Sequence, residues 1–513
     1  MNGAECLVRS AQRVGVEVCF ANPGTTEMHL VAALDRVPGV RAVLGLFEGV
    51  CTGAADGYAR VSGRPALTVL HLGPGFANGI ANLHNARRAR TPVVNLIGDH
   101  ASWHLASDPP LASDIESLAR PVSGWLHRAK HVEDLGGDVT RAIAAALRPP
   151  GQVATLIVPA DLAWSPATQV AGPLTSEPAA RVPNERILEV AGALRTGESA
   201  LLLIGSHGLH GRGLRASGRV AAASGCRAFC ETFPARMERG AGLPALERLP
   251  YFPEQILELL GGIRHLILAG ATAPVAFFGY PDRPSRLVPE SCRLHELAWP
   301  DEDVAAALEE LADALDAPTD APGAESHATP LPDGELTPVS LGAAIAATQP
   351  EGLIVVDEAA TSGLPYFLGA TGCPPHTYMS LTGGAIGQGL PCATGAAIAA
   401  PDRRVLAFQA DGSGMYTLQA LWTQAREGLD VTTVICANRS YRILRIELDR
   451  AAIGEPGPRA LDLTDLSRPT LNWVSLGQGM GVPSVCVETT DALVTELRRA
   501  FSEPGPRLIE AVL

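Results

Sequence analysis

The chain has 513 residues, 46% of them hydrophobic and 18% charged, so it can bury several large cores and is expected to form about three domains. A net charge of −14 without any block of Lys or Arg argues against nucleic acid and membrane surfaces as partners. No apolar run approaches the roughly 20 residues that cross a bilayer, and the N-terminal segment lacks the apolar core of a secretion signal. We therefore expect a cytoplasmic protein whose ten scattered Cys, which lack zinc-site spacing, are reduced and buried.

Residues 1–170 alternate between strand-like and helix-like segments. Short apolar runs predict strands over 16–21, 40–46, 66–71 and 92–98. Apolar residues at helical spacing predict helices over 4–13, from Met28, over 49–61 and over 77–88, with Gly73-Pro74-Gly75 as a loop before the last. Alternation of strands and helices at this spacing predicts a parallel, doubly wound α/β sheet.

A second α/β unit is expected over residues 182–315, with strands at 200–204 and 265–269. The first of these strands runs into a glycine-rich segment, 205–213. Glycines after a strand are typical of a dinucleotide-binding loop, but the spacing departs from GxGxxG and no acidic residue is suitably placed. A glycine-rich connection and a nucleotide site both remain open for this segment.

Residues 316–338 are rich in Pro, Ala, Asp and Gly and contain few large apolar side chains, which is typical of a linker between domains. A third α/β unit is expected over 339–513. The predicted fold class is therefore α/β, with three doubly wound parallel-sheet domains.

The most informative stretch of the third unit is 405–448. It predicts a strand over 405–409, a turn at Asp411-Gly412-Ser413-Gly414, a helix over 415–427, and a strand over 431–436 that ends before Asn438. Because parallel strands open on the same edge of a sheet, Asp411 and Asn438 can share one hard cation. The glycines and the helix N-terminus suit a diphosphate bridged by Mg²⁺, whereas the simplest alternative is an ordinary Asp-Gly turn with a structural Asn.

Three other residues occupy places where either a structural or a functional role is open. Glu48 follows an apolar strand and opens a helix, where a carboxylate either serves a site or balances the helix dipole. His71 ends another strand, and a lone His there is either a structural hydrogen-bonding residue or a catalyst. Ile386 lies in a glycine-rich segment, and most Ile side chains fill cores.

Two segments resemble the enzymes that use thiamine diphosphate (ThDP). Ala410-Asp411-Gly412 and Ala437-Asn438 resemble their metal motif: Ala410 and Ala437 depart from the usual Gly and Asn, while both expected ligand positions are kept. LFEGVCTGAADGYAR, which contains Glu48, resembles their cofactor-activating segment. The whole chain is similar to the decarboxylase and acetolactate synthase branch, first to short acetolactate synthase large-subunit-like proteins and then to benzoylformate decarboxylase. The resemblance implies a pyrimidine-binding domain (1–170), a middle Rossmann-like domain (182–315) and a diphosphate-binding domain (339–513).

The resemblance also implies roles around the cofactor. Glu48 is expected to hydrogen-bond N1′ of the aminopyrimidine, so that N4′ can take the proton from thiazolium C2. The Gly384 carbonyl is expected to accept from the N4′ amino group, and Ile386 to wedge between the two rings. The expected Mg²⁺ ligands are Asp411, Asn438 and the backbone carbonyl of Ser440. The residues expected beside the diphosphate are Gly412, Ser413 and either Thr361 or Ser362.

Benzoylformate decarboxylase suggests two candidate catalytic residues. His71 matches an active-site His of that enzyme, and Thr25 matches its active-site Ser. Its second active-site His falls near Gly279, where this chain has none, which argues against proton relay by a His pair.

The segment after the metal motif forms one wall of the substrate site in relatives. Here that wall contains Arg442, Leu444, Arg445 and Glu447, and His100 is a further candidate for the rim. The charges are either solvated helix charges or, for Arg442 or Arg445, partners of a substrate carboxylate.

The resemblance leaves three functions open. The first is decarboxylation of a small 2-oxo acid with carboligation of the enamine to a second carbonyl, as in acetolactate synthases. The second is simple decarboxylation of an aromatic or branched 2-oxo acid. The third is a ThDP fold that binds cofactor or partner without turnover.

The implied cofactors are ThDP and Mg²⁺, and the implied assembly is a homodimer or homotetramer. In that assembly Glu48 of one subunit faces Asp411 and Asn438 of the partner subunit. True acetolactate synthases also retain FAD in the middle domain. We do not expect FAD here, because the chain is short and 205–213 fits a dinucleotide loop poorly.

Overall fold

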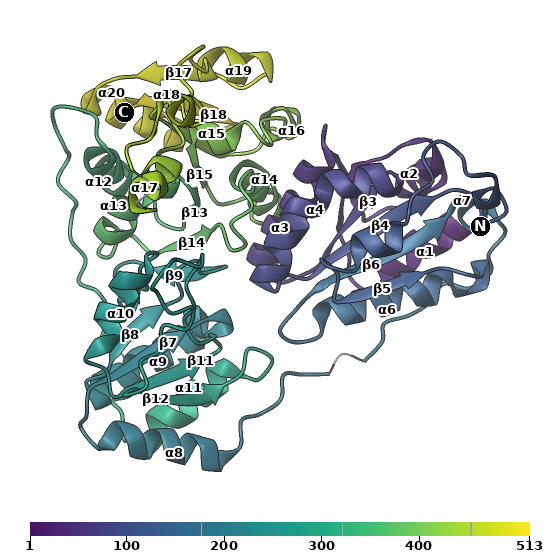
Figure 1. The fold of residues 1–513 in the computed structure, drawn as a ribbon. Coiled ribbons are helices and arrows are strands. Elements are labelled where there is room, and N and C mark those ends of the chain that lie inside the picture. Colours follow the sequence, from purple (N-terminus) through teal and green to yellow (C-terminus); the bar gives the residue numbers. More distant parts are fainter. Residues whose placement is uncertain (176, 321, 452–453) are drawn as a thin grey trace.

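The computed structural model describes residues 1–175, 177–320, 322–451 and 454–513. The chain forms three α/β units around three mainly parallel sheets, which confirms the predicted fold class (Figure 1). The first unit lies on the right of Figure 1, the middle unit at the lower left and the third unit at the upper left. The limits of the domains and the linker remain predictions. Residue 321 of that linker and residues 452–453 of the third unit lie outside the described residues.

Six parallel strands form the first sheet in the order β2-β1-β3-β4-β6-β5. Alternate residues of β1 serve two different cores, with Phe20 in one and Cys19 in the other, so both faces of the sheet are covered. The strand order reverses direction between β1 and β3. The strands are β1 (Val18–Asn22), β2 (Arg41–Leu44), β3 (Ala66–Leu70), β4 (Val93–Asp99), β5 (Trp125–Arg128) and β6 (Val153–Pro159).

Helices surround this sheet, and one of them corrects a prediction. Gly73-Pro74-Gly75, predicted as a loop, lies inside the first turn of α4. Leu72 takes a positive φ of 52° and makes the turn, and Pro74 is tolerated because the first helical turn needs no N–H donor. The helices are α1 (Gly3–Arg13), α2 (Met28–Arg36), α3 (Glu48–Ser62), α4 (Leu72–Ala89), α5 (Ile115–Ala119), α6 (Leu135–Leu147) and α7 (Ala160–Trp164).

The middle unit holds five parallel strands in the order β10-β8-β7-β11-β12. The strands predicted at 200–204 and 265–269 have those bounds, and the strand order reverses between them. The elements are β7 (Ala200–Ile204), β8 (Arg227–Cys230), β10 (Glu247–Arg248), β11 (His265–Ala269), β12 (Arg293–Ala298), α8 (Asn184–Arg195), α9 (Gly211–Ser224), α10 (Pro253–Gly261) and α11 (Val304–Ala314).

The third sheet has seven strands in the order β17-β18-β16-β15-β13-β14-β9. Its edge strand β9 (Met237–Arg239) comes from the middle unit and pairs antiparallel with β14, so this sheet is not wholly parallel. The order reverses between β13 and β15. The other strands are β13 (Ile354–Glu358), β14 (His376–Ser380), β15 (Val405–Ala410), β16 (Val431–Ala437), β17 (Ser484–Val487) and β18 (Arg507–Val512).

The helices of the third unit include a second correction. The helix predicted over 415–427 begins only at Ala420, because residues 415–419 form turns in which the Thr417 hydroxyl donates to the Gly387 carbonyl, 2.8 Å away. The helices are α12 (Pro338–Thr348), α13 (Gly363–Gly369), α14 (Gly389–Ala399), α15 (Asp411–Gly414), α16 (Ala420–Glu427), α17 (Arg442–Arg450), α18 (Pro458–Asp462), α19 (Trp473–Gly479) and α20 (Thr490–Ser502).

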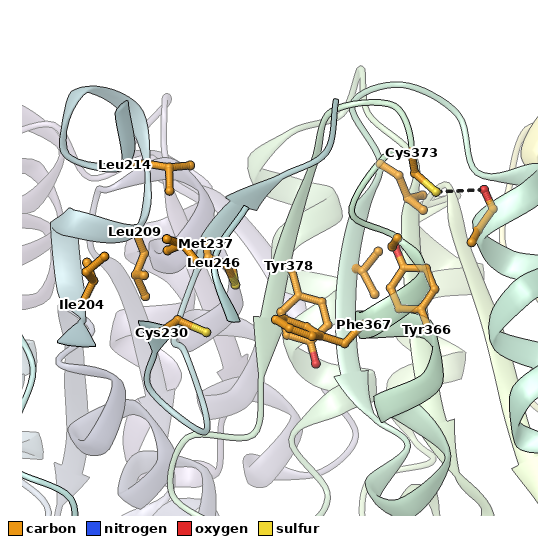
Figure 2. Packing of buried hydrophobic residues seen from close by; sticks show 14 of the residues in the cluster. Ile204, Leu209, Leu214, Cys230, Met237, Leu246, Tyr366, Phe367, Cys373 and Tyr378 are labelled. Atoms are coloured by element: carbon orange, nitrogen blue, oxygen red, sulfur yellow. Dashed lines mark hydrogen bonds between the residues drawn. The ribbon is translucent and has the colours of Figure 1, made fainter. Parts of the chain in front are cut away.

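One apolar core runs through both the middle and the third unit. Figure 2 shows Leu209 and Met237 of the middle unit in the same cluster as Tyr366 and Tyr378 of the third. Nine of the ten Cys are buried, whereas Cys486, expected inside an apolar strand, is exposed at the edge of its sheet. Across the described ranges, every helix is too short or too polar to cross a bilayer.

A buried ion pair on α3 joins the three units. Asp56 and Arg60 lie one helical turn apart, form hydrogen bonds of 2.9 and 2.7 Å, and are almost completely buried. Arg60 also donates to the carbonyl oxygens of Ala235 in the middle unit and Ser380 in the third. Gln388 of the third unit donates to Asp56. The pair therefore anchors the first unit against both others.

We predict that Asp56→Ala lowers the free energy of unfolding by about 3–5 kcal/mol, because Arg60 then stays buried without its anion. Urea denaturation followed by tryptophan fluorescence measures the change. Glu5→Ala, which removes a surface ion pair with Arg36, is the control and should cost much less. Equal losses in the two variants would contradict a buried junction.

Candidate active site

Two candidate catalytic residues lie where the first sheet reverses. Thr25 follows β1 and His71 follows β3, and ligands of doubly wound sheets bind beyond the strand ends at this point. The His71 Nδ1 atom lies 2.8 Å from a carboxyl oxygen of Glu27, which is fully buried. Glu27 also accepts from the Gly24 N–H and the Thr26 hydroxyl. The imidazole of His71 is thus held by a fixed acceptor beside Thr25.

Glu48 lies next to His71 on the same side of the first unit. It opens α3, is 9% exposed, and accepts a 3.0 Å hydrogen bond from the Asn78 side chain. Gly75 lies between these two residues, since a Cβ added at Gly75 would lie 2.8 Å from Glu48 Oε1 and 3.2 Å from His71 Cβ. Glu48, His71 and Thr25 therefore form one group on the first unit.

A cavity of about 330 Å³ adjoins this group. Thr25, Thr26 and His100 line it, so His100 is close to the predicted catalytic residues. The rest of the lining is mainly aromatic: His29, Trp103, His104 and Trp164. The cavity combines imidazole groups with broad apolar surfaces and has no carboxylate in its wall.

The predicted metal ligands meet where the third sheet reverses. Asp411 follows β15 and is 2% exposed, and its carboxylate accepts from the N–H groups of Gly412 and Arg439, at 2.8 and 2.7 Å. The Asn438 side-chain oxygen accepts from the Ser440 N–H at 3.0 Å. The bond to Arg439 ties the turn of Asn438 and Ser440 to Asp411, and burial raises the pKa of the Asp411 carboxyl.

This donor set fits a hard divalent cation. Carboxylate, amide and carbonyl oxygens are the ligands that Mg²⁺ prefers, and each oxygen above keeps a lone pair beyond its hydrogen bond. Within the described ranges, His, Cys, Asp and Glu side chains nowhere gather in threes that could hold a metal. A site here must therefore draw on amide, backbone, phosphate or water oxygens, as Mg²⁺ sites do.

The other predicted cofactor residues lie near the same edge. Ser362 is 2% exposed and Thr361 half-buried in the short helix η5 (Ala360–Ser362) after β13. Ser413 is buried in α15. Gly384 is exposed and Ile386 half-buried in the loop before α14, so Ile386 is not a core aliphatic residue.

The predicted substrate wall is helix α17. Leu444 and Arg442 are exposed on it. The other two charged candidates have protein partners: Arg445 donates to the Thr464 hydroxyl at 3.0 Å, and Glu447 accepts from the Tyr280 hydroxyl at 3.1 Å. The structure thus leaves Arg442 and Leu444 freer to face a ligand than Arg445 and Glu447.

In the middle sheet, a side chain from the first unit occupies the place where the strand order reverses. Arg90, at the end of α4, donates to the Ser206 hydroxyl at 3.0 Å and to the Gly270 carbonyl at 3.3 Å. Glu231 stands beside Gly205 in the same place, and withdrawal of its carboxyl group from water raises its pKa to about 7. Side chains of this chain thus occupy the place where a dinucleotide loop would hold its ligand.

Sequence reasoning missed Glu27 and Asn78, the partners of His71 and Glu48. The sequence contains a local signal for Glu27, because Gly24 and Glu27 have the spacing of a capping box. The sequence contains no such signal for Asn78, because Asn78 contacts Glu48 only when α3 and α4 pack together. The predicted residues form two groups, one on the first unit and one on the third, and in the described chain no hydrogen bond joins the two groups.

Two family models match the sequence. The N-terminal TPP binding domain of thiamine pyrophosphate enzymes matches residues 1–118, and the C-terminal TPP binding domain of these enzymes matches residues 364–511. The first match contains Thr25, Glu48 and His71, and the second contains Asp411 and Asn438. Each group of predicted residues thus falls within a domain described as binding thiamine pyrophosphate, another name for ThDP.

Several proteins resemble the chain over its whole length. The "Putative acetolactate synthase large subunit IlvX" of Mycobacterium tuberculosis is 54% identical, covering 100% of this chain and 99% of the relative. Benzoylformate decarboxylase of Pseudomonas aeruginosa is 29% identical, covering 97% of this chain and 96% of the relative. The structure of a ThDP-dependent 4-hydroxybenzoylformate decarboxylase from Rhodococcus jostii RHA1 superposes with a TM-score of 0.86 at 25% identity, covering 99% of this chain and 98% of the other.

Glu231 gives a pH-dependent prediction for the middle sheet. Its pKa is about 7 in the folded protein and about 4.3 in an unfolded chain, so between these values only the folded state keeps the proton. Stability is then lost as pH rises from about 4 through 7. We expect Glu231→Gln to raise the melting temperature more at pH 8 than at pH 5, measured by calorimetry. Exposed Glu185→Gln is the control, and a Glu231→Gln effect equal at both pH values would contradict the assignment.

Proposed function

The chain belongs to the thiamine pyrophosphate enzymes of the acetolactate synthase and benzoylformate decarboxylase family, and from this premise we propose that it decarboxylates a small 2-oxo acid and ligates the remaining fragment to a second carbonyl compound. The observation that carries the proposal is that the chain holds an almost buried Glu48 on its first unit and the oxygen donors Asp411 and Asn438 on its third. The 54% identity to a protein named as an acetolactate synthase large subunit supports ligation.

We assign some of these residues to binding the cofactor and Glu48 to the transfer of its proton. When bound, ThDP would supply a thiazolium ring that takes up the electron pair left on the substrate when CO₂ departs. We assign Glu48 to N1′ of the aminopyrimidine, where Asn78 fixes one of its oxygens. Asp411, Asn438 and the Ser440 carbonyl are assigned to Mg²⁺. Ser362, Thr361, Gly412 and Ser413 are assigned to the diphosphate, because they follow the ends of the neighbouring parallel strands β13 and β15.

We propose that a second copy of the chain completes the site. His71 and Asn85 are 14 positions apart along α4, which separates them by about 21 Å at 1.5 Å per residue. Asn85 contacts the loop of Gly384 and Ile386, so in one chain His71 lies far from that loop. A cofactor held at that loop would therefore lie far from His71 of the same chain. We therefore propose a homodimer or homotetramer in which His71 of one subunit serves the cofactor held by its partner, together with Glu48, which neighbours His71 across Gly75 and has this role in the resemblance.

A second candidate function is decarboxylation of an aromatic or bulky 2-oxo acid without ligation. The cavity beside Thr25 favours it, since about 330 Å³ lined by Trp and His side chains exceeds what a methyl group fills. The held imidazole of His71 suits protonation of the product. Binding without turnover is the third candidate, and the retained Glu48, Asp411 and Asn438 weigh against it.

Proton NMR of the protein with ThDP, Mg²⁺ and pyruvate tests the proposal, with Glu48→Gln as the matched variant. Glu48→Gln keeps the shape and the Asn78 contact but cannot carry the carboxylate charge. We expect acetolactate with the natural protein and a loss of at least about 100-fold in the variant, in line with the loss of one acid–base group.

The same spectra separate the other candidates. Acetaldehyde without acetolactate would contradict ligation, and turnover of phenylglyoxylate but not pyruvate would favour the second candidate. No turnover of either acid, despite bound ThDP, would favour binding alone. Asp411→Ala is the binding control, because it should remove both Mg²⁺ and ThDP from the protein.

A further inference from the structure

The loop that carries Gly384 and Ile386 has no secondary structure of its own. Residues 381–388 connect β14 to α14 without a helix or strand, and Gly384 and Gly387 have φ values of 75° and 96°. Gly384 is exposed to solvent and Ile386 is half-buried, whereas Gly387 is buried. Because no ladder or helical bonds hold it, its conformation depends on side chains from other segments.

Asn85 of α4 forms hydrogen bonds with the loop at Ala385. Its amide nitrogen donates to the Ala385 carbonyl at 2.7 Å, and its amide oxygen accepts from the Ala385 N–H at 3.2 Å. Asn85 is fully buried, and its nitrogen also donates to the Asn82 side chain at 3.1 Å. Ala385 lies between Gly384 and Ile386, so this two-way contact fixes the peptide that joins the two residues assigned to the cofactor.

Glu358 forms hydrogen bonds with the buried end of the same loop. Its carboxyl oxygens accept from the N–H groups of Gly387, at 2.6 Å, and of Gly389. The carboxyl group is 4% exposed, and burial raises its pKa to about 7. Keeping a buried carboxyl group costs free energy unless its oxygens are satisfied, and here the two N–H groups of the loop satisfy them.

We propose that Asn85 and Glu358 are positioning residues for the cofactor, which fix loop 383–389 so that the Gly384 carbonyl and the Ile386 side chain are preorganised. The inference rests on the proposed function, which assigns those two groups to the aminopyrimidine and to the space between the rings. Neither positioning residue needs to touch the cofactor. They act on the distance between N4′ and C2, and displacement of a reacting group by about 1 Å can cost about 100-fold in rate.

The experiment measures proton–deuterium exchange at C2 of bound ThDP, by NMR after acid quenching, in the holoprotein with Mg²⁺. Asn85→Ala removes both bonds to Ala385, and Glu358→Gln replaces one acceptor oxygen with a donor that opposes an N–H group. We expect each variant to slow exchange per bound cofactor by at least about tenfold. The dissociation constant of ThDP, measured by fluorescence quenching, should change by much less.

Asn95→Ala is the matched control. Asn95 is a fully buried Asn of β4 that bonds Thr68 and Thr155, far in sequence from the loop and without contact to it. It should leave the exchange rate per bound cofactor unchanged even if it lowers stability. If Asn85→Ala does not fold, Asn85→Ser takes its place, with the same expectation.

Natural exchange rates in both loop variants, with normal exchange in the unmodified protein, would overturn this inference and leave the proposed function intact. Slowed exchange in Asn95→Ala to the same extent would also overturn it, because any loss of packing would then suffice. An unmodified protein that binds no ThDP would overturn the proposed function and this inference with it.

Discussion

The packing of α3 and α4 against the third unit is the constraint on which the rest of the structure depends. Gly57 of α3 and Gly395 of α14 permit the approach: a Cβ at Gly57 would lie 2.0 Å from the Cys392 carbonyl oxygen, and a Cβ at Gly395 would lie 1.8 Å from that of Ala54. Polar groups buried by this approach must be satisfied. Asp56, Arg60 and Asn85 satisfy them by binding one another or the backbone of the third unit.

The same two helices place chemical groups at their N-termini. Glu48 opens α3 and His71 precedes α4, while Arg60 and Asn85 lie further along the same helices. Each helix therefore connects a candidate catalytic residue with a contact that holds the other half of the site. Helix α4 keeps His71 about 21 Å from Asn85, and this separation is the reason why our account includes a second subunit.

The sequence predicted what depends on local pattern. Parallel β15 and β16 bring Asp411 and Asn438 to one edge, because both strands are buried apolar runs separated by one crossover. It missed what depends on contacts between distant segments. Asn85 and Ala385 are 300 positions apart, and the partner of Glu447 is Tyr280 from another unit, so no window of sequence contains either pair. The helical Gly73-Pro74-Gly75 was missed because the positive φ at Leu72 has no sequence signature.

Subunit complementation tests the central claim, that each site is built from two copies of the chain. Glu48→Gln and Asp411→Ala are each expected to be inactive when purified alone. In a mixed dimer one site carries both substitutions and the other carries none, so co-refolded variants should recover about a quarter of the natural activity. Mixed dimers that form, as shown by two different affinity tags, and yet remain inactive would contradict a site shared between subunits.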